Sequence, residues 1–112
     1  METIPWQDFV RVDIRVGRIV SAEVFAAARK PAYVLRVDFG AEIGERTSSA
    51  QITGRYRPEE LVGRLVVGVV NLPEKRIGPL SSGCLITGFP DENGEVVLCV
   101  PDKPVQPGAR LF

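Results

Sequence analysis

The alternation of apolar and polar residues predicts a chain made mostly of β-strands. The clearest strand covers residues 33–39, in which the apolar side chains fall at every second position: Tyr33, Leu35, Val37 and Phe39. A period of two is typical of a strand with one buried face. Residues 45–53 form a more polar third strand, and Gly40 and Gly44 separate the two segments.

The first long strand is expected over residues 13–24, but its apolar positions change phase between Val16 and Ile19. Gly17 lies at this phase change, where glycine in a strand often marks a β-bulge. A bulge at Gly17 would return Ile19 to the core and turn two basic side chains outward together, Arg15 and Arg18. Strongly bent first strands of this kind occur in small closed barrels.

Three later segments are apolar at consecutive positions, so that both of their faces favour burial: residues 65–71, 84–87 and 96–100. A small barrel can bury only the inner face of each strand. The outer faces must therefore meet a partner subunit or a ligand, or else be covered by the N-terminal turn and the C-terminal arm of the same chain. The pattern leaves these alternatives open.

Two short helical segments are also expected. Residues 58–61 begin with proline followed by two acidic residues, which suits the first turn of a helix. Residues 3–10 can form a helical turn with Thr3 as its cap and Pro5 near its start. That turn would present one apolar face, formed by Trp6 with Phe9 or Val10.

The remaining signals complete a small all-β fold. Residues 91–94 form a hairpin turn in which Asn93-Gly94 suits positive φ, and the proline-rich tail of residues 101–112 is expected to pack back onto the barrel. About five strands, with a short helix between the third and fourth, describe a single domain over residues 1–112. The predicted architecture is the five-stranded Greek-key barrel of the oligonucleotide/oligosaccharide-binding (OB) fold.

Composition then narrows the possible chemistry. The chain has 112 residues with 14 basic and 14 acidic side chains, and it contains no histidine and two cysteines. The absence of histidine excludes Ser-His-Asp and Cys-His catalytic sites, and two cysteines cannot supply a four-ligand Cys/His zinc site. We therefore expect a binding protein that is not an enzyme and uses no cofactor.

The cellular location is predicted from what the chain lacks. Cys84 and Cys99 lie in apolar runs and are expected to be buried free thiols of a reducing compartment. No signal peptide is visible, and no apolar run reaches the ~18 residues that a membrane span needs. These features predict a cytoplasmic protein with no membrane insertion.

Basic residues gather at two predicted loops. Arg29 and Lys30 precede Pro31 between the first and second strands, Arg36 follows on the second strand, and Lys75-Arg76 opens a loop rich in glycine and serine. Phosphate contact is one reading of these groups, and solvated charged turns are the other. The excess of arginine over lysine fits either phosphate recognition or the codon bias of a GC-rich genome.

Nine blocks of sequence resemble, in order, the CsaA family of bacterial export-related chaperones: residues 12–19, 28–33, 37–40, 48–53, 58–63, 69–71, 76–79, 88–91 and 101–102. Those chaperones belong to the tRNA-binding-domain superfamily, which also includes the C-terminal domain of many methionyl-tRNA synthetases. The resemblance covers nearly the whole chain. The blocks Ser-Ser-Ala-Gln-Ile-Thr and Ala-Arg-Lys-Pro-Ala-Tyr are specific to the CsaA branch.

This resemblance implies an OB-fold homodimer without catalysis, in which the N- and C-terminal extensions take part in dimerisation. It implies unfolded preprotein segments as partners in protein export, with tRNA as the alternative ligand. Lys30 matches a lysine that contacts RNA in the tRNA-binding relatives, although the Asn and Asp of their Asn-Ala-Asp-Lys block are absent here. Ser82 and Leu85 match two further RNA-contacting positions, and Gly83 replaces a glutamate between them. The RNA-binding residues expected from composition and resemblance together are Arg29, Lys30, Arg36, Arg76, Ser82 and Leu85.

Overall fold

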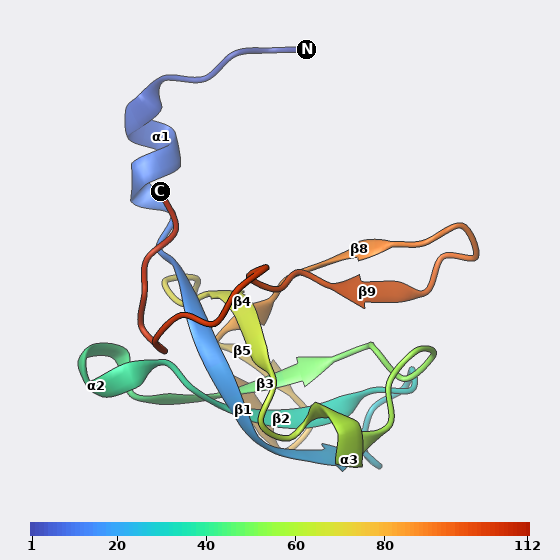
Figure 1. Ribbon diagram of the computed structural model, residues 1–112. Coiled ribbons are helices and arrows are strands. Elements are labelled where there is room, and N and C mark those ends of the chain that lie inside the picture. The colour runs from blue at the N-terminus through green and yellow to red at the C-terminus, as the bar shows by residue number, and fades with distance from the viewer.

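Five antiparallel strands form the main sheet of the computed structural model, which describes all residues 1–112 (Figure 1). Their order is β3-β2-β1-β4-β7, and their bounds are β1 Ile14–Val24, β2 Tyr33–Asp38, β3 Glu45–Ala50, β4 Leu65–Val69 and β7 Leu85–Ile86. The sheet curls until its two ends meet, where the amide of Gly83 donates to the carbonyl of Thr47 at 2.8 Å. The result is a nearly closed barrel, and the predicted OB-like fold is confirmed.

Two hairpins and three short helices complete the chain: β5 Lys75–Ile77 with β6 Leu80–Ser82, β8 Gly88–Pro90 with β9 Val96–Leu98, α1 Trp6–Arg11, α2 Gly40–Ile43 and α3 Pro58–Leu61. The segment that was expected to be a basic loop is the β5–β6 hairpin, so that prediction was wrong. Gly78 turns this hairpin with φ +57°, a value that favours glycine. In the β8–β9 turn only Gly94 has positive φ, and Asn93 does not.

The core lies inside the barrel and confirms the alternation of β2. The side chains of Tyr33, Leu35, Val37 and Phe39 are all buried, while those between them are not. Ile19 from β1 and Val66 from β4 pack against them, and Leu61 of α3 closes one end of the cluster. The predicted helix at residues 58–61 is therefore present and contributes a core residue.

The structure of β1 corrects the predicted bulge. Gly17 pairs with Val66 in an unbroken β1–β4 ladder, and the register shift lies further along, between Ile19 and Ser21. Gly17 instead faces the core, because a Cβ at this position would lie 2.5 Å from a methyl carbon of Val37. With no bulge before Ile19, residues 15 and 18 lie on opposite sides of the strand, and the expectation that Arg15 and Arg18 turn outward together was wrong.

Arg15 instead fastens three segments to one another. Its guanidinium donates to Asp13 at 2.6 Å, to Glu42 of α2 at 2.6 Å and to the carbonyl of Gly108 in the C-terminal tail at 3.1 Å. The tail also pairs with β1 through backbone bonds, such as the one from Val16 N–H to the carbonyl of Ala109 at 2.9 Å. The prediction that the tail packs back on the barrel is confirmed.

We expect Asp13→Asn to lower the free energy of unfolding by about 1 kcal/mol at pH 7, because it removes a charge-assisted bond to a largely buried arginine. The hydrogen bond from Arg15 holds the pKa of Asp13 below its usual value of 3.8. A lowered pKa in the folded state contributes stability above the pKa of the unfolded chain, and this stability is lost as the pH falls through the folded value. The difference between variant and wild type should therefore be present at pH 7 and shrink below about pH 4.

Urea unfolding at pH 7 and at pH 3 measures this difference. Glu42→Gln is the control, because the Glu42 side chain is 73% exposed and surface ion pairs contribute little. Equal effects of the two variants, or an effect of Asp13→Asn that does not change with pH, would contradict the assigned role.

The strands predicted to bury both faces behave in two ways. In β4 the outward residues Val67 and Val69 are buried, because later segments of the same chain cover them. The carbonyl of Val67 accepts the amide of Thr87, and the amide of Val67 donates to the carbonyl of Cys99. In β7 and β9 the outer positions remain exposed, with Leu85 at 52% and Val97 at 42%. For these two strands the chain's own termini do not cover the outer faces, which leaves the alternative of a partner subunit or a ligand.

Two arms project from the barrel. Figure 1 shows α1 standing away from it with the C-terminus alongside, and the β8–β9 hairpin extending in a different direction. The radius of gyration is 14.1 Å, slightly above the ~13 Å of a compact chain of this length. The helix is capped by Pro5 without a side-chain bond, so the cap predicted at Thr3 was wrong.

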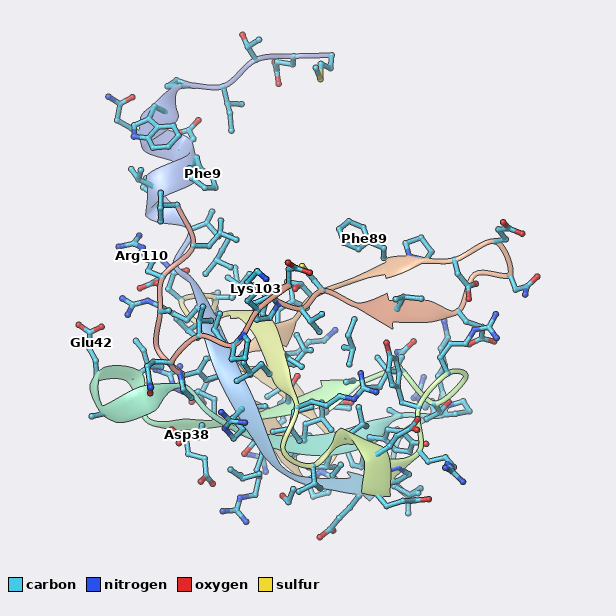
Figure 2. The ribbon with its side chains drawn as sticks, viewed as in Figure 1. Phe9, Asp38, Glu42, Phe89, Lys103 and Arg110 are labelled. Atoms are coloured by element: carbon cyan, nitrogen blue, oxygen red, sulfur yellow. The ribbon has the colours of Figure 1, made fainter.

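The apolar side chains of α1 meet those of the chain end. Trp6 and Phe9 pack with ring centroids 5.1 Å apart, and none of the helix is buried. We use the term terminal arm surface for the apolar residues that line a groove here beside Arg110: Trp6, Phe9, Val10, Val12, Leu111 and Phe112. Phe9 and Arg110 are visible near the top of Figure 2. No helix of the structure has the length and apolar character required to cross a bilayer.

Candidate nucleic-acid and polypeptide interface

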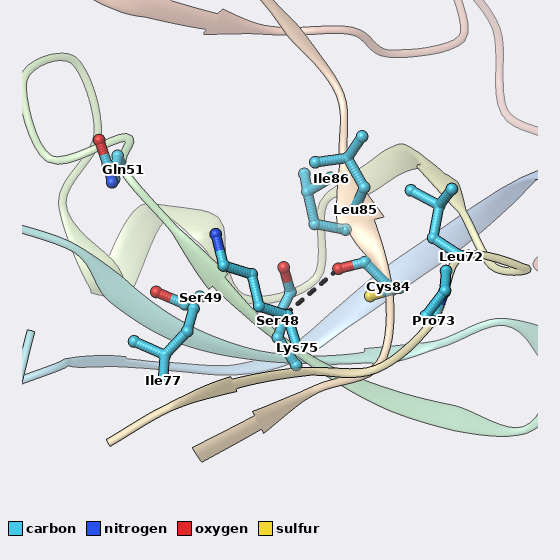
Figure 3. Close-up of a pocket in the computed structure, with 11 residues that line it drawn as sticks. Ser48, Ser49, Gln51, Leu72, Pro73, Lys75, Ile77, Cys84, Leu85 and Ile86 are labelled. Atoms are coloured by element: carbon cyan, nitrogen blue, oxygen red, sulfur yellow. Dashed lines mark hydrogen bonds between the residues drawn. The ribbon is translucent and has the colours of Figure 1, made fainter. Parts of the chain in front are cut away.

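A cavity opens where the two ends of the barrel sheet separate. It lies between β3, β5 and β7, has a volume of about 260 Å³ and is open to solvent (Figure 3). Its wall is mixed, with hydroxyl and amide groups from β3 and the segment after it, and with apolar, basic and hydroxyl groups from the segments opposite: Ser48, Ser49, Gln51, Leu72, Pro73, Lys75, Ile77, Ser82, Cys84, Leu85 and Ile86. Two of the predicted site residues, Ser82 and Leu85, are therefore part of this cavity.

The cavity follows from the short β7. Since β7 has only two residues, it cannot run alongside the whole of β3, and the single bond between Gly83 and Thr47 ties only one end of the seam. Arg46 fastens that end by donating to the carbonyls of Val70 at 3.2 Å and Gly83 at 3.1 Å. Beyond these bonds β6 lies beside β3 without forming a ladder with it, and the cavity opens to solvent here.

Cys84 lies in the wall of the cavity as an unreactive thiol. Burial raises its pKa to about 11, and this outweighs a hydrogen bond with Ser48 and the nearby charge of Arg46, which act in the opposite direction. The thiol is therefore protonated at neutral pH. Both cysteines are free: Cys84 is buried as predicted, and Cys99 is half-buried.

A basic groove adjoins the cavity and shares four wall residues with it: Ser49, Gln51, Lys75 and Ile77. We use the term basic groove for the cationic side chains that line it: Arg29, Lys30, Lys75 and Arg76. The groove is assembled from two separate elements, because the loop after β1 carries Arg29 and Lys30 while β5 carries Lys75 and Arg76. The structure thus brings together three of the predicted residues, Arg29, Lys30 and Arg76.

The cations of the basic groove have no acidic partners, since none of them has a carboxylate oxygen within 4.0 Å. Several arginines elsewhere in the chain do: Arg55 pairs with Asp91 at 2.7 Å, and Arg15 pairs with Asp13 and Glu42. A chain of zero net charge therefore leaves uncompensated positive charge at one surface. Such a surface attracts anionic groups.

Arg36 does not join the groove. It lies on the exposed side of β2, where its guanidinium pairs with Glu45 of the neighbouring strand at 2.6 Å, and it lines neither the groove nor the cavity. Tyr56 also stays outside the groove and anchors the core, since its hydroxyl accepts the amide of Leu98 and its carbonyl accepts the hydroxyl of Tyr33.

Sequence reasoning missed Lys75 as a site residue. The signal was present, because Lys75 and Ile77 are two positions apart and would share one face of a strand. Treating residues 75–82 as a loop hid this relation. Ser49 and Gln51 were also missed as site residues, because the sequence of a polar segment does not show whether its side chains will line a cavity.

Comparison with known families bears on this geometry. Residues 14–110 match the family described as "Putative tRNA binding domain", which is most of the chain. The protein belongs to the tRNA-binding-domain family. Two solved structures resemble this chain over nearly its whole length. The chaperone CsaA from Bacillus anthracis is 42% identical with a TM-score of 0.92, covering 99% of this chain and 100% of that one. The CsaA chaperone protein from Picrophilus torridus is 41% identical with a TM-score of 0.91, covering 98% and 100%.

Members of the tRNA-binding-domain family also occur inside longer proteins. A methionine–tRNA ligase from Pyrococcus furiosus is 40% identical over 112 residues, which is 99% of this chain and 15% of the ligase. The chain thus spans about 15% of the length of the ligases that it matches. The CsaA chaperones and the methionine–tRNA ligases that the chain matches both support the family resemblance predicted from the sequence.

Proposed function

We propose that this protein is a non-catalytic binding protein of the CsaA type, which holds unfolded polypeptide segments such as preproteins in the cytoplasm before export. The resemblance to two CsaA chaperones over their full length supports this proposal, because no part of those chains is missing here. The ligases, in contrast, contain many residues with no counterpart in this chain.

The observation that carries the proposal is the amount of exposed apolar surface. Sixteen large hydrophobic side chains are exposed, against sixteen hydrophobic residues in the buried core. Among the exposed ones, Phe89 is 65% accessible on the β8–β9 hairpin and is labelled in Figure 2. Scattered apolar side chains are ordinary at a protein surface, but those that gather in one large patch, as they do at the two chain ends, often mark a binding surface.

Part of that apolar surface is assigned to a second copy of the chain. The terminal arm surface combines aromatic and aliphatic groups from both ends of the chain, and aromatic side chains are enriched at protein interfaces. We infer a homodimer formed through the N- and C-terminal segments. The apolar groups of β7 and the β8–β9 hairpin would then remain available to a polypeptide.

The test is whether the protein keeps an unfolded client from aggregating. Light scattering of chemically denatured citrate synthase, diluted with increasing amounts of this protein, should fall to a low plateau near one dimer per client. Titration calorimetry with a reduced, unfolded lactalbumin measures direct binding. Undiminished scattering together with no heat of binding would reject the proposed function.

A second candidate function is tRNA binding, and the basic groove favours it. Four unpaired cations beside a cavity of hydroxyl, amide and apolar groups offer phosphate contacts and a place for an unstacked base. Purification of the protein from cells, with assay of both RNA and bound polypeptide in the eluate, distinguishes the two candidates.

We expect Lys30→Ala to weaken tRNA binding about tenfold at low salt and to reduce the slope of log affinity against log salt by about one. Arg36→Ala is the matched control, because Arg36 is already paired with Glu45 and lies outside the groove. Filter binding at several salt concentrations gives both quantities. Equal losses in the two variants, or no loss for Lys30→Ala, would contradict the assignment of the groove.

A further inference from the structure

The position of α1 depends on its carboxyl-terminal end. The helix has six residues, none of which is buried, and Pro5 caps its amino-terminal end without a side-chain bond. A helix of this length is not stable by itself in water. What holds the end that runs into β1 therefore decides where the rest of the helix points.

Two side chains from distant parts of the chain bind the last carbonyl groups of α1. Arg110 donates through Nη2 to the carbonyl of Val10 at 2.7 Å. Asn71 donates through Nδ2 to the carbonyl of Arg11 at 2.7 Å. The last carbonyls of a helix have no partner within it, and a positive charge at this end is favoured by the helix dipole. We use the term arm caps for Asn71 and Arg110, and Figure 2 shows Arg110 below Phe9.

The arm caps come from the two segments that flank the start of β1, which are β4 on one side and the C-terminal tail on the other. Asn71 lies just after β4, and its Oδ1 accepts the amide of Asp13 at 2.8 Å. Arg110 lies in the tail, where the next residue, Leu111, donates its amide to the carbonyl of Ile14 at 2.8 Å. Both caps are therefore held against the barrel, and they join α1 to it from two sides.

The aromatic side chains of α1 lie further from the barrel than these bonds. Trp6 and Phe9 belong to the terminal arm surface, and Trp6 is 65% exposed. A small rotation at the carboxyl-terminal end of the helix would move them away from their positions. Association is weakened when an interface has to be ordered during binding, so that a helix held in place favours it.

We propose that Asn71 and Arg110 are positioning residues of the homodimer, which hold α1 in the direction in which the terminal arm surface meets the same surface of a second copy. This inference rests on the proposed homodimer and names the residues that prepare its interface. Asn71 does not line the groove of the terminal arm surface, so that its effect on association acts through α1. In a two-fold symmetric dimer each substitution acts in both copies.

The test removes each cap separately. Asn71→Asp keeps the size of the side chain and an acceptor for Asp13, but at pH 7 it has no donor for the carbonyl of Arg11. Arg110→Ala removes the other cap. Sedimentation velocity over a range of concentrations should show a dissociation constant raised at least about tenfold in each variant.

Two controls make the same changes of charge elsewhere. Asn93→Asp and Lys103→Ala alter exposed residues whose side chains form no hydrogen bond in the structure. They should change the dissociation constant less than about twofold. Circular dichroism checks that the barrel of every variant is folded, and each cap variant tests the inference by itself.

A second measurement follows α1 directly, because Trp6 is the only tryptophan of the chain. Time-resolved fluorescence anisotropy separates local motion of Trp6 from the tumbling of the whole protein. Both cap variants should gain a fast component. Phe112→Glu is the reference, since it disturbs the terminal arm surface but keeps both caps, and it should gain none. The comparison distinguishes a helix that has lost its position from an interface that has lost a contact.

The outcomes separate this inference from the homodimer on which it rests. Dimers as tight as the wild type in both cap variants, or a fast Trp6 component as large in Phe112→Glu as in the cap variants, would overturn the positioning role and leave the homodimer in place. A wild-type protein that sediments as a single chain would overturn both. Suppression of client aggregation tests polypeptide binding independently of either result.

Discussion

Gly17→Ala is expected to destabilise the barrel by about 2–3 kcal/mol, the cost of overpacking a filled core. The added Cβ would lie 2.5 Å from Cγ1 of Val37 and 2.8 Å from ring carbons of Phe39, and both of these side chains are fully buried. They cannot withdraw into solvent, so that the strand itself must shift. The midpoint of thermal unfolding should fall by about 10 °C.

Gly83→Ala is the matched control for this substitution. A Cβ at Gly83 would meet only the flexible side chain of Arg46, at 3.7 Å, which is an ordinary contact distance. We therefore expect a change within about 0.5 kcal/mol. Thermal and urea unfolding of both variants provide the comparison. Wild-type stability in Gly17→Ala would mean that Gly17 does not pack closely against β2.

The same glycine explains why one part of the fold could be predicted from the sequence and another could not. The alternation of β2 is local, because each residue needs only its position in a strand to be assigned to the core. The role of Gly17 depends on Phe39, which is 22 residues away in sequence, and no periodicity within residues 13–24 reports that contact. The phase change needs no bulge, because Ile19 faces the core while Val16 lies on the other face of β1, where the C-terminal tail pairs with the strand.

The candidate site, like the fold, could be predicted only in part from the sequence. Arg29, Lys30 and Arg76 were chosen from local clustering and from matched positions, and the structure gathers them in one groove. Arg36 was chosen on the same grounds but lies outside the groove and pairs with Glu45. Whether an arginine is available to a ligand depends on which acidic residues lie near it in the fold. Glu45 lies diagonally across from Arg36, two residues from its partner Thr47, only because β2 and β3 pair in the observed register.

The charge balance has a physical consequence for both candidate ligands. Because five of the nine arginines outside the groove pair with acidic side chains and none inside it does, zero net charge and a basic surface coexist in one small chain. An anionic polymer and the acidic flank of a polypeptide would be attracted by the same groups. Salt dependence alone cannot distinguish them, whereas an assay of the RNA and the polypeptide that co-purify with the protein can.

The second large effect is expected at the terminal arm surface. We predict that Trp6→Glu combined with Phe9→Glu raises the dissociation constant of the dimer at least about a hundredfold, because aromatic side chains are the usual hot spots of interfaces and two charges would be buried without partners. The barrel should stay folded, since no residue of α1 belongs to the buried core. Sedimentation velocity at micromolar concentration measures the change.

Val24→Glu is the control for the added negative charge. Val24 is 70% exposed and ends β1, at the opposite end of that strand from α1, so that this variant should sediment as the wild type does. A wild-type protein that sediments as a single chain at micromolar concentration would contradict the homodimer itself. A double glutamate variant that remains fully dimeric would instead move the interface away from the terminal arm surface, and the exposed β8–β9 hairpin with Phe89 would be the next surface to test.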